Sequence, residues 1–166
     1  MPARNPPSDV DSRVESFIDK FDAANARTIR ACRDELRKLF PTAVELVYDN
    51  YNFFVIGYCA TAKPSSCIVS LAAAANGVGL SFYRGATLAD PDRLLLGEGV
   101  QNRFIRLPDA DVLRDERVLA LIRAAVAQAP TALPPTGPRQ TIVQSVSAKQ
   151  RPRRRPHPFA TVPNDR

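Results

Sequence analysis

The sequence predicts an α+β domain with two N-terminal helices, a mostly antiparallel sheet of about five strands and a C-terminal helix. Three observations predict this class. Apolar residues recur at helical spacing before residue 41, the pattern changes to strand-like runs between residues 43 and 107, and short hairpin-length links join those runs. With 166 residues, of which 45% are hydrophobic, the chain can build the core of one domain.

The two N-terminal helices are predicted from their caps and their apolar spacing. Ser12 and Glu15 fit a capping box at the start of a short amphipathic helix. Asp22 fits the cap of a longer second helix, which Pro41 ends. The polar residues 1–11 that precede the first helix are predicted to form a flexible arm.

Aromatic and β-branched composition then predicts the sheet. The expected strands are 43–48, 52–60, 67–75, 78–84 and 103–107. Between the third and fourth strands, Asn76-Gly77 predicts a type I′ turn, which requires positive φ at both residues. Asp90 and Pro91 predict the start of a brief helix, and Asp115 predicts the cap of a C-terminal helix over about 116–128.

Charge divides the chain into a neutral body and a basic end. From Arg139 onward there are seven Lys and Arg residues against one acidic residue, so this end alone accounts for the net charge of +6. We therefore expect a folded domain over 12–129, a Pro-rich linker over 130–148 that could add an edge strand, and a basic, disordered tail over 149–166.

The residues of the body exclude several enzyme classes. The only histidine, His157, lies in the basic tail, so residues 12–129 cannot contain a Ser-His-Asp or Cys-His arrangement. The sequence also lacks the glycine-rich motifs that bind nucleotide phosphates. We therefore expect that the protein is not an enzyme.

The cysteines and the hydropathy pattern indicate a cytoplasmic protein. The three cysteines show no metal-type spacing and are interpreted as reduced thiols, although Cys59 and Cys67 could pair across a hairpin in an oxidising compartment. No apolar run approaches the ~20 residues that cross a bilayer, and residues 1–10 do not resemble a signal peptide. No membrane partner is expected.

A polar cluster is the first candidate ligand site, because Asn, Tyr and Arg side chains together can bind a carboxylate or a phosphate. Its members are Tyr48, Asp49, Asn50, Asn52, Tyr83, Arg84, Arg103 and Arg106. The alternative interpretation assigns Asp49 and Asn50 to a turn and the arginines to a solvated sheet face.

A carboxylate stripe beside the apolar face of the first helix is a candidate metal site. It comprises Asp11, Glu15, Asp19 and Asp22, and exposed oxygen ligands of this kind suit loosely bound iron. The alternative is that they cap helices and are otherwise solvated. A basic stripe on the second helix, Arg30, Arg33 and Arg37, is interpreted as a solvated surface paired with Asp34 and Glu35.

The basic tail is the third candidate site. Lys149, Arg151, Arg153, Arg154 and Arg155 could contact the phosphates of a nucleic acid or an acidic protein, with an affinity that falls steeply with salt. The alternative is a disordered, solubilising end of the chain.

Three stretches of the sequence resemble the YdhG-like domain family. They are "VESFIDKFDAANARTIRACRDELRKLF", "FPTAVELVYDNYNF" and "GVQNRFIRLPDADVL", and the ending "SAKQRPRR" is similar to that of a divergent subgroup. The matching motif positions are Pro41, Glu45, Tyr48, Ile105 and Arg106, whereas Asp49-Asn50-Tyr51 replaces the family's Gly-Met-Pro. One branch of this family is regarded as a frataxin-like iron chaperone that uses acidic residues, and the family has no catalytic signature.

Together these observations predict a cytoplasmic, non-enzymatic binding or accessory protein. The resemblance implies an iron chaperone, with iron as the bound ion. The alternative is a module that associates with a nucleic acid or another polyanion through the basic tail. An exposed edge strand would also permit a homodimer.

Overall fold

The helices begin at side-chain caps in the computed structural model, which describes residues 8–156. In α1 (Asp9–Ile18), the Ser8 hydroxyl accepts a hydrogen bond from the backbone N–H of Asp11 at 3.1 Å. The predicted capping box at Ser12 is therefore wrong, and the helix begins one turn earlier. Residues 9–11 belong to α1 and not to an arm, while residues 1–7 of the predicted arm lie outside the described part of the chain.

The other two helices form where their caps predict them. Asp22 caps α2 (Ala23–Leu39) by accepting from the N–H of Asn25 at 2.8 Å, and the helix ends just before Pro41. Asp115 caps α3 (Glu116–Gln128) in the same way. Short 3₁₀ turns lie at Pro64–Ser66, Gly85–Thr87 and Ala110–Arg114.

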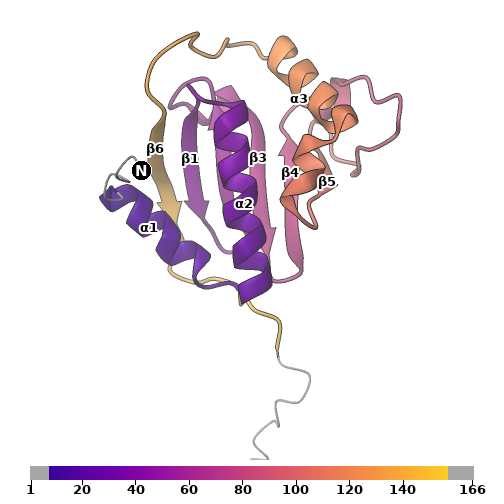
Figure 1. The fold of residues 1–166 in the computed structure, drawn as a ribbon. Coiled ribbons are helices and arrows are strands. Elements are labelled where there is room, and N and C mark those ends of the chain that lie inside the picture. Colours follow the sequence, from indigo (N-terminus) through magenta and orange to yellow (C-terminus); the bar gives the residue numbers. More distant parts are fainter. Residues whose placement is uncertain (1–7, 157–166) are drawn as a thin grey trace, which may run out of the picture.

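The α+β class is confirmed, and the sheet has six strands. They are β1 (Val44–Asp49), β2 (Phe54–Cys59), β3 (Cys67–Ala74), β4 (Gly77–Phe82), β5 (Arg103–Arg106) and β6 (Gln140–Val146). The spatial order is β5-β4-β3-β2-β1-β6, and every neighbouring pair is antiparallel except β1 and β6, which are parallel. The segment after α3 crosses one end of the sheet to reach this edge (Figure 1).

Two local predictions are wrong. The β3–β4 hairpin turns at Ala75-Asn76, because Ala74 pairs with Gly77, and of these residues only Gly77 has a positive φ, at 139°. Asp90 does not start a helix. Its carboxylate accepts the backbone N–H groups of Leu94 and Leu95 at 2.9 Å each, which folds this segment into a loop instead.

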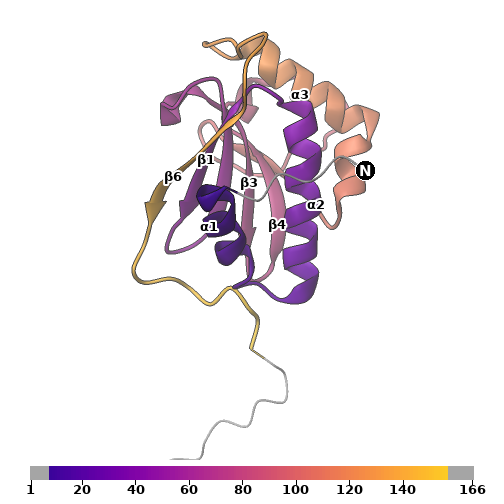
Figure 2. The same ribbon diagram turned by 60° about the vertical axis from the view of Figure 1, so that its left-hand side comes forward.

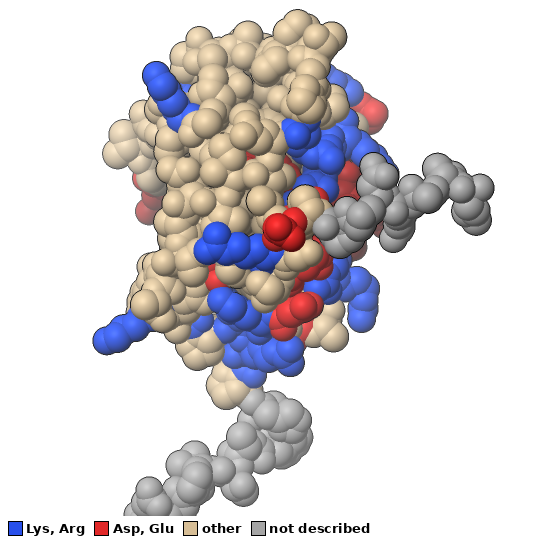
Figure 3. Space-filling view, turned by 90° about the vertical axis from the view of Figure 1, so that its left-hand side faces the viewer, with Lys and Arg blue, Asp and Glu red and all other residues tan. Residues whose placement is uncertain are grey.

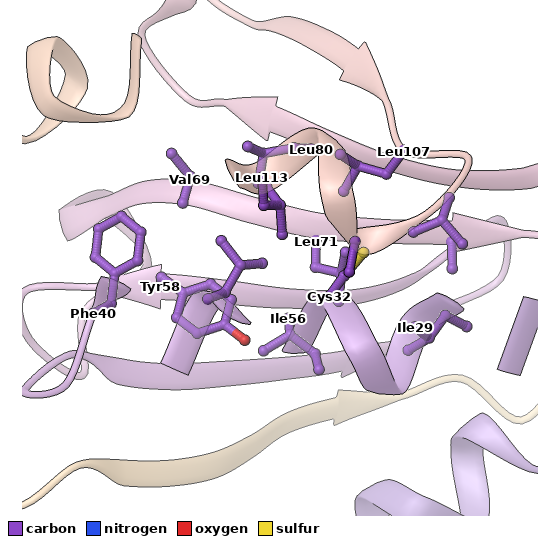
Figure 4. Packing of buried hydrophobic residues seen from close by; sticks show 14 of the residues in the cluster. Ile29, Cys32, Phe40, Ile56, Tyr58, Val69, Leu71, Leu80, Leu107 and Leu113 are labelled. Atoms are coloured by element: carbon purple, nitrogen blue, oxygen red, sulfur yellow. The ribbon is translucent and has the colours of Figure 1, made fainter. Parts of the chain in front are cut away.

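The core lies between the sheet and the helices, which all cover the same sheet face (Figures 1 and 2). Ile29 and Cys32 of α2 point toward Ile56 of β2 and Leu71 of β3 in this layer (Figure 4). Burying each such side chain stabilises the fold by about 1.5–3 kcal/mol. Within residues 8–156 no helix covers the opposite face, where a small cluster forms around Leu46, Cys59 and Cys67. The sheet thus has one covered face and one open face.

Candidate functional site

The acidic stripe of α1 faces the basic stripe of α2, and acidic and basic side chains are intermixed on that side of the molecule (Figure 3). Asp11 accepts from Arg33 at 3.3 Å and from Arg37 at 3.1 Å. Arg30 binds Glu15 at 2.7 Å and Asp19 at 2.5 Å. The interpretation of these arginines as a solvated surface paired with Asp34 and Glu35 is therefore wrong, because the two stripes pair with each other.

Glu45 of β1 is the centre of the buried part of this network, and its side chain is fully buried. Its carboxylate accepts two hydrogen bonds each from Arg33 and Arg37, at 2.7–3.2 Å. Tyr58 Oη and Thr141 Oγ1 donate to it at 3.0 and 2.8 Å. A buried carboxylate is tolerated only with such a complete set of donors. The network joins α2, β1, β2 and β6.

This network predicts acid lability. Burial alone would raise the pKa of Glu45, but hydrogen bonds from Arg37 and Arg33 lower it to about 2, below the ordinary glutamate value of 4.5. Because the folded pKa is the lower one, its stabilisation is fully present above about pH 4.5 and is lost as the pH falls toward 2. We expect the free energy of unfolding to fall by about 3 kcal/mol from this group over that window. Urea unfolding at a series of pH values measures it.

The control for this pH series is Glu35→Gln, which removes a carboxylate that pairs with Arg114 and Lys38 at the surface. Its pH profile should keep the wild-type shape, because surface pairs contribute little. A wild-type stability that is constant from pH 6 to pH 3 would contradict the assignment to Glu45.

A second buried ion pair anchors the C-terminal segment 147–156. Asp49 of β1 is fully buried, and its carboxylate accepts from Arg153 Nη2 at 3.0 Å and from Lys20 Nζ at 2.6 Å. Arg153 is only 5% exposed and also donates to the carbonyl oxygen of Asn50 at 2.6 Å. Gln150 Nε2 donates to the Asp49 carbonyl at 2.8 Å.

Other cations of this segment also bind the body. The N–H of Arg151 donates to Tyr51 O at 2.8 Å, and its guanidinium lies 5.7 Å from the Tyr51 ring centre. Arg154 donates to Asp19 O and Lys20 O at the end of α1, where cations are favoured. Arg155 donates to Asn76 O at 3.3 Å, in the β3–β4 turn.

The prediction of a disordered tail is therefore wrong for residues 149–156, because their cations are used to hold the segment in place. Arg153 cannot serve as a surface contact for a polyanion, whereas Lys149, Arg151, Arg154 and Arg155 are exposed. Residues 157–166, including His157, belong to the part that the structure leaves undescribed. The division into a neutral body and a mobile basic end does not hold.

The predicted metal ligands point to other partners. Glu15 and Asp19 bind Arg30, and the carboxylate of Asp22 caps α2. Over residues 8–156 no group of three or more His, Cys, Asp or Glu side chains could hold a metal ion. Glu15, Asp19 and Asp22 therefore do not converge as a metal site.

The predicted polar cluster is divided between several places. Tyr48 packs beside the small cluster of the open face, Asp49 faces the helices, and Asn50 accepts from Ser145 Oγ at 2.7 Å. Asn52 is exposed between β1 and β2. The Arg84 guanidinium lies over the Tyr83 ring, beyond the end of β4. Arg103 donates hydrogen bonds to the carbonyl oxygens of Gly99 and Asn102. Only Arg106 lines a sizeable hollow.

That hollow is a groove of about 950 Å³ on the open face of the sheet. Small side chains line it on two strands, namely Ser70, Ala72 and Ala74 of β3 and Gly77, Gly79 and Ser81 of β4. Phe53, Val55, Phe104 and Arg106 flank them, and the groove extends to Asn25 and Thr28 of α2. The Arg106 guanidinium lies 5.8 Å from the Phe104 ring centre.

Sequence reasoning missed this groove, although the alternation of small residues along "SLAAAANGVGLS" was visible. Alternate residues of a strand share one face, so this pattern places Ser, Ala and Gly together. The pattern says nothing about whether the face is covered. The groove is open because no helix within residues 8–156 lies over this face.

No family model matches the chain, and no curated protein or solved structure is significantly similar to it. The YdhG-like resemblance therefore stays a prediction. None of the helices within residues 8–156 has the length and the hydropathy needed to cross a bilayer.

Proposed function

We propose that the protein is a non-enzymatic binding module whose open-face groove takes a small organic anion with a flat apolar body. The observation that carries this proposal is the groove of about 950 Å³, in which Arg106 is the only charged residue that residues 8–156 contribute to the lining. Ligand pockets commonly have volumes of ~300–1,000 Å³, mostly apolar walls and a few polar groups that fix orientation.

The shape of the groove supports a flat ligand. Its floor carries no side chain larger than serine along Ser70, Ala72 and Ala74 or along the facing residues of β4. A planar body can therefore lie directly on the strands, with Phe53 and Phe104 at its edges. Phe53 is 50% exposed, so a ligand that covers it removes apolar surface from water.

The charge of the groove supports an anion. No Asp or Glu lines it, and Arg106 takes part in no ion pair among residues 8–156. A guanidinium can bind a carboxylate, sulfonate or phosphate through two parallel hydrogen bonds. Asn102, Ser70 and Ser81 add neutral donors within the same lining.

The residues of the groove support binding and not catalysis. General acid–base chemistry requires a group such as imidazole, carboxylate, thiol or amine within hydrogen-bond reach of the substrate. The described lining contains none of these. A ligand held there would therefore be bound without proton transfer to a side chain.

The proposal predicts charge-selective binding of a fluorescent probe. We expect saturable binding of 1-anilinonaphthalene-8-sulfonate to the folded protein, followed by fluorescence titration. Arg106→Gln should weaken binding about tenfold or more, because a hydrogen bond to a charged group contributes about 1.5–3 kcal/mol. Ala72→Phe should abolish it by filling the floor of the groove.

Two controls make this experiment specific. Arg123→Gln removes an exposed cation of α3 and should leave binding unchanged. The uncharged analogue N-phenyl-1-naphthylamine should lose affinity in Ala72→Phe but not in Arg106→Gln. The proposal fails if the wild type binds neither probe, or if Ala72→Phe binds both as the wild type does.

The iron-chaperone and polyanion hypotheses stay predictions. The pairing of Glu15 and Asp19 with Arg30 gives the first no support. The exposed Lys149, Arg151, Arg154 and Arg155 keep the second testable by salt-dependent retention on a polyanion column.

A further inference from the structure

Cys59 and Cys67 lie directly opposite each other on neighbouring strands. They are register partners of β2 and β3, at a position where the ladder shifts by a bulge. Opposed residues of antiparallel strands have Cα atoms about 4.5–5.5 Å apart, within the range of about 4.4–6.8 Å that a disulfide requires. Both belong to the small cluster on the open face of the sheet, apart from the main core.

Gly57 leaves the space that the two sulfur atoms share. A Cβ atom at this position would lie 3.2 Å from Cys67 Sγ and 3.4 Å from Cys59 Sγ. Both thiols therefore point toward the same spot on the open face. A larger residue at position 57 would push against both sulfur atoms.

The two thiols differ in their surroundings. Cys67 Sγ lies 3.4 Å from Val69 O and 3.3 Å from Ser70 Oγ. As a whole residue Cys67 is 9% exposed, compared with 1% for Cys59. The neighbouring Cys59 thiol and, after it, the Ser70 hydroxyl lower the pKa of Cys67 against the opposing effect of burial, whereas the same pairing raises the pKa of Cys59. Cys67 is therefore the more nucleophilic member of the pair.

We propose that Cys59 and Cys67 form a dithiol that reacts with a hydroperoxide to give a cross-strand disulfide. The Cys67 thiolate attacks one peroxide oxygen, the O–O bond breaks, and Cys67 becomes a sulfenic acid while an alcohol or water leaves. Cys59 then attacks the Cys67 sulfur, the S–S bond forms and water leaves. Two thiols are oxidised and one hydroperoxide is reduced.

A small oxidant would approach Cys67 from beside the groove on the open face, since neither cysteine lines the groove itself, and Cys67 also lines a small separate hollow with Arg84 and Gln128. Ser70 lines that groove and its hydroxyl touches Cys67 Sγ. No described helix lies between the pair and solvent on this side. Cys32, by contrast, is fully buried between α2 and the sheet, and burial raises its pKa to about 12. Cys32 thus serves as an unreactive control within the same protein. The proposed dithiol does not depend on the proposed ligand-binding function.

The test is peroxide treatment of the folded, reduced protein, followed by alkylation in denaturant and peptide mass spectrometry. We expect a linkage between Cys59 and Cys67, with Cys32 recovered as the alkylated thiol. In Cys59→Ser, Cys67 should be trapped as a sulfenic acid by dimedone. In Cys67→Ser, Cys59 should stay reduced at the same peroxide dose, and Cys32→Ser should behave as the wild type.

Far-UV circular dichroism of each variant before peroxide treatment checks that it is folded, so that only folded variants are compared with the wild type. If Cys59→Ser does not fold, the order of alkylation of Cys59 and Cys67 in the wild type gives the same information, with Cys67 expected first. The proposal is overturned if both thiols are recovered fully alkylated from the peroxide-treated wild type. It is also overturned if Cys32 is oxidised as fast as Cys67.

Discussion

Glu45→Ala is expected to lower the free energy of unfolding by about 3–5 kcal/mol, the largest effect of any single substitution discussed for this protein. The change removes the acceptor that Arg33, Arg37, Tyr58 and Thr141 share. Arg33 is 5% exposed, so its guanidinium would remain buried without its main partner. Breaking a buried pair from one side carries a cost of this size. Urea unfolding at pH 7 measures it.

The matched control for this substitution is Glu35→Ala. Glu35 also binds an arginine, Arg114, at 2.7 Å, but that arginine is 56% exposed, so a loss of about 1 kcal/mol or less is expected. If Glu45→Ala leaves no folded protein, Glu45→Gln keeps the shape and two hydrogen-bonding atoms and should retain part of the stability. Equal losses for Glu45→Ala and Glu35→Ala would show that the buried network is not the cause.

Arg153→Ala is expected to release the C-terminal segment and to lower the free energy of unfolding by about 2–3 kcal/mol. Asp49 is fully buried and would keep Lys20 but lose the guanidinium that faces its other oxygen. A hydrogen bond to a charged group contributes ~1.5–3 kcal/mol, and here one is also lost at Asn50 O. The loss should be smaller than for Glu45 because the lysine still compensates the carboxylate.

Two measurements distinguish release of the segment from general destabilisation. The amides of Ser147 and Arg151 donate to Asp49 O and Tyr51 O, so their hydrogen exchange should accelerate before that of β1. Trypsin should cleave near residues 149–155 first. Arg155→Ala, which removes one exposed contact to Asn76 O, is the control and should change neither rate. Unchanged exchange in Arg153→Ala would contradict the anchoring role.

Helices with strong local patterns could be predicted from the sequence. Asp22 and Asp115 each stand immediately before an apolar period and cap the helices that follow. Ser12 also matches the pattern of a helix cap, but the residue that caps α1 is Ser8. Its hydroxyl accepts the backbone N–H of Asp11, so the helix begins one turn before Ser12. Two serines in similar contexts cannot be ranked by sequence pattern alone.

The candidate sites depended on contacts between distant residues, which local patterns do not contain. The stripes of α1 and α2 were each visible, but their mutual pairing is set by how the two helices lie on the sheet. Arg153 looked like part of a solvated cationic run, and nothing near it in the sequence indicates Asp49 as its partner. Arg106 was a candidate ligand-binding residue in the sequence, and it lines the groove, but the groove itself follows from the uncovered face of the sheet and from no pattern near Arg106.

The parallel pairing of β1 with β6 has a consequence for synthesis on the ribosome. Val44 pairs with Gln140, so the edge of the sheet next to β1 stays unfilled until nearly the entire described chain has emerged. The Glu45 carboxylate likewise lacks a hydrogen bond until Thr141 has been synthesised, and the Asp49 carboxylate lacks one until Arg153 has been synthesised. Nascent chains that stop short of residue 140 would leave β1 as an unpaired edge strand with two incompletely paired carboxylates, and unpaired strand edges make such fragments prone to aggregate.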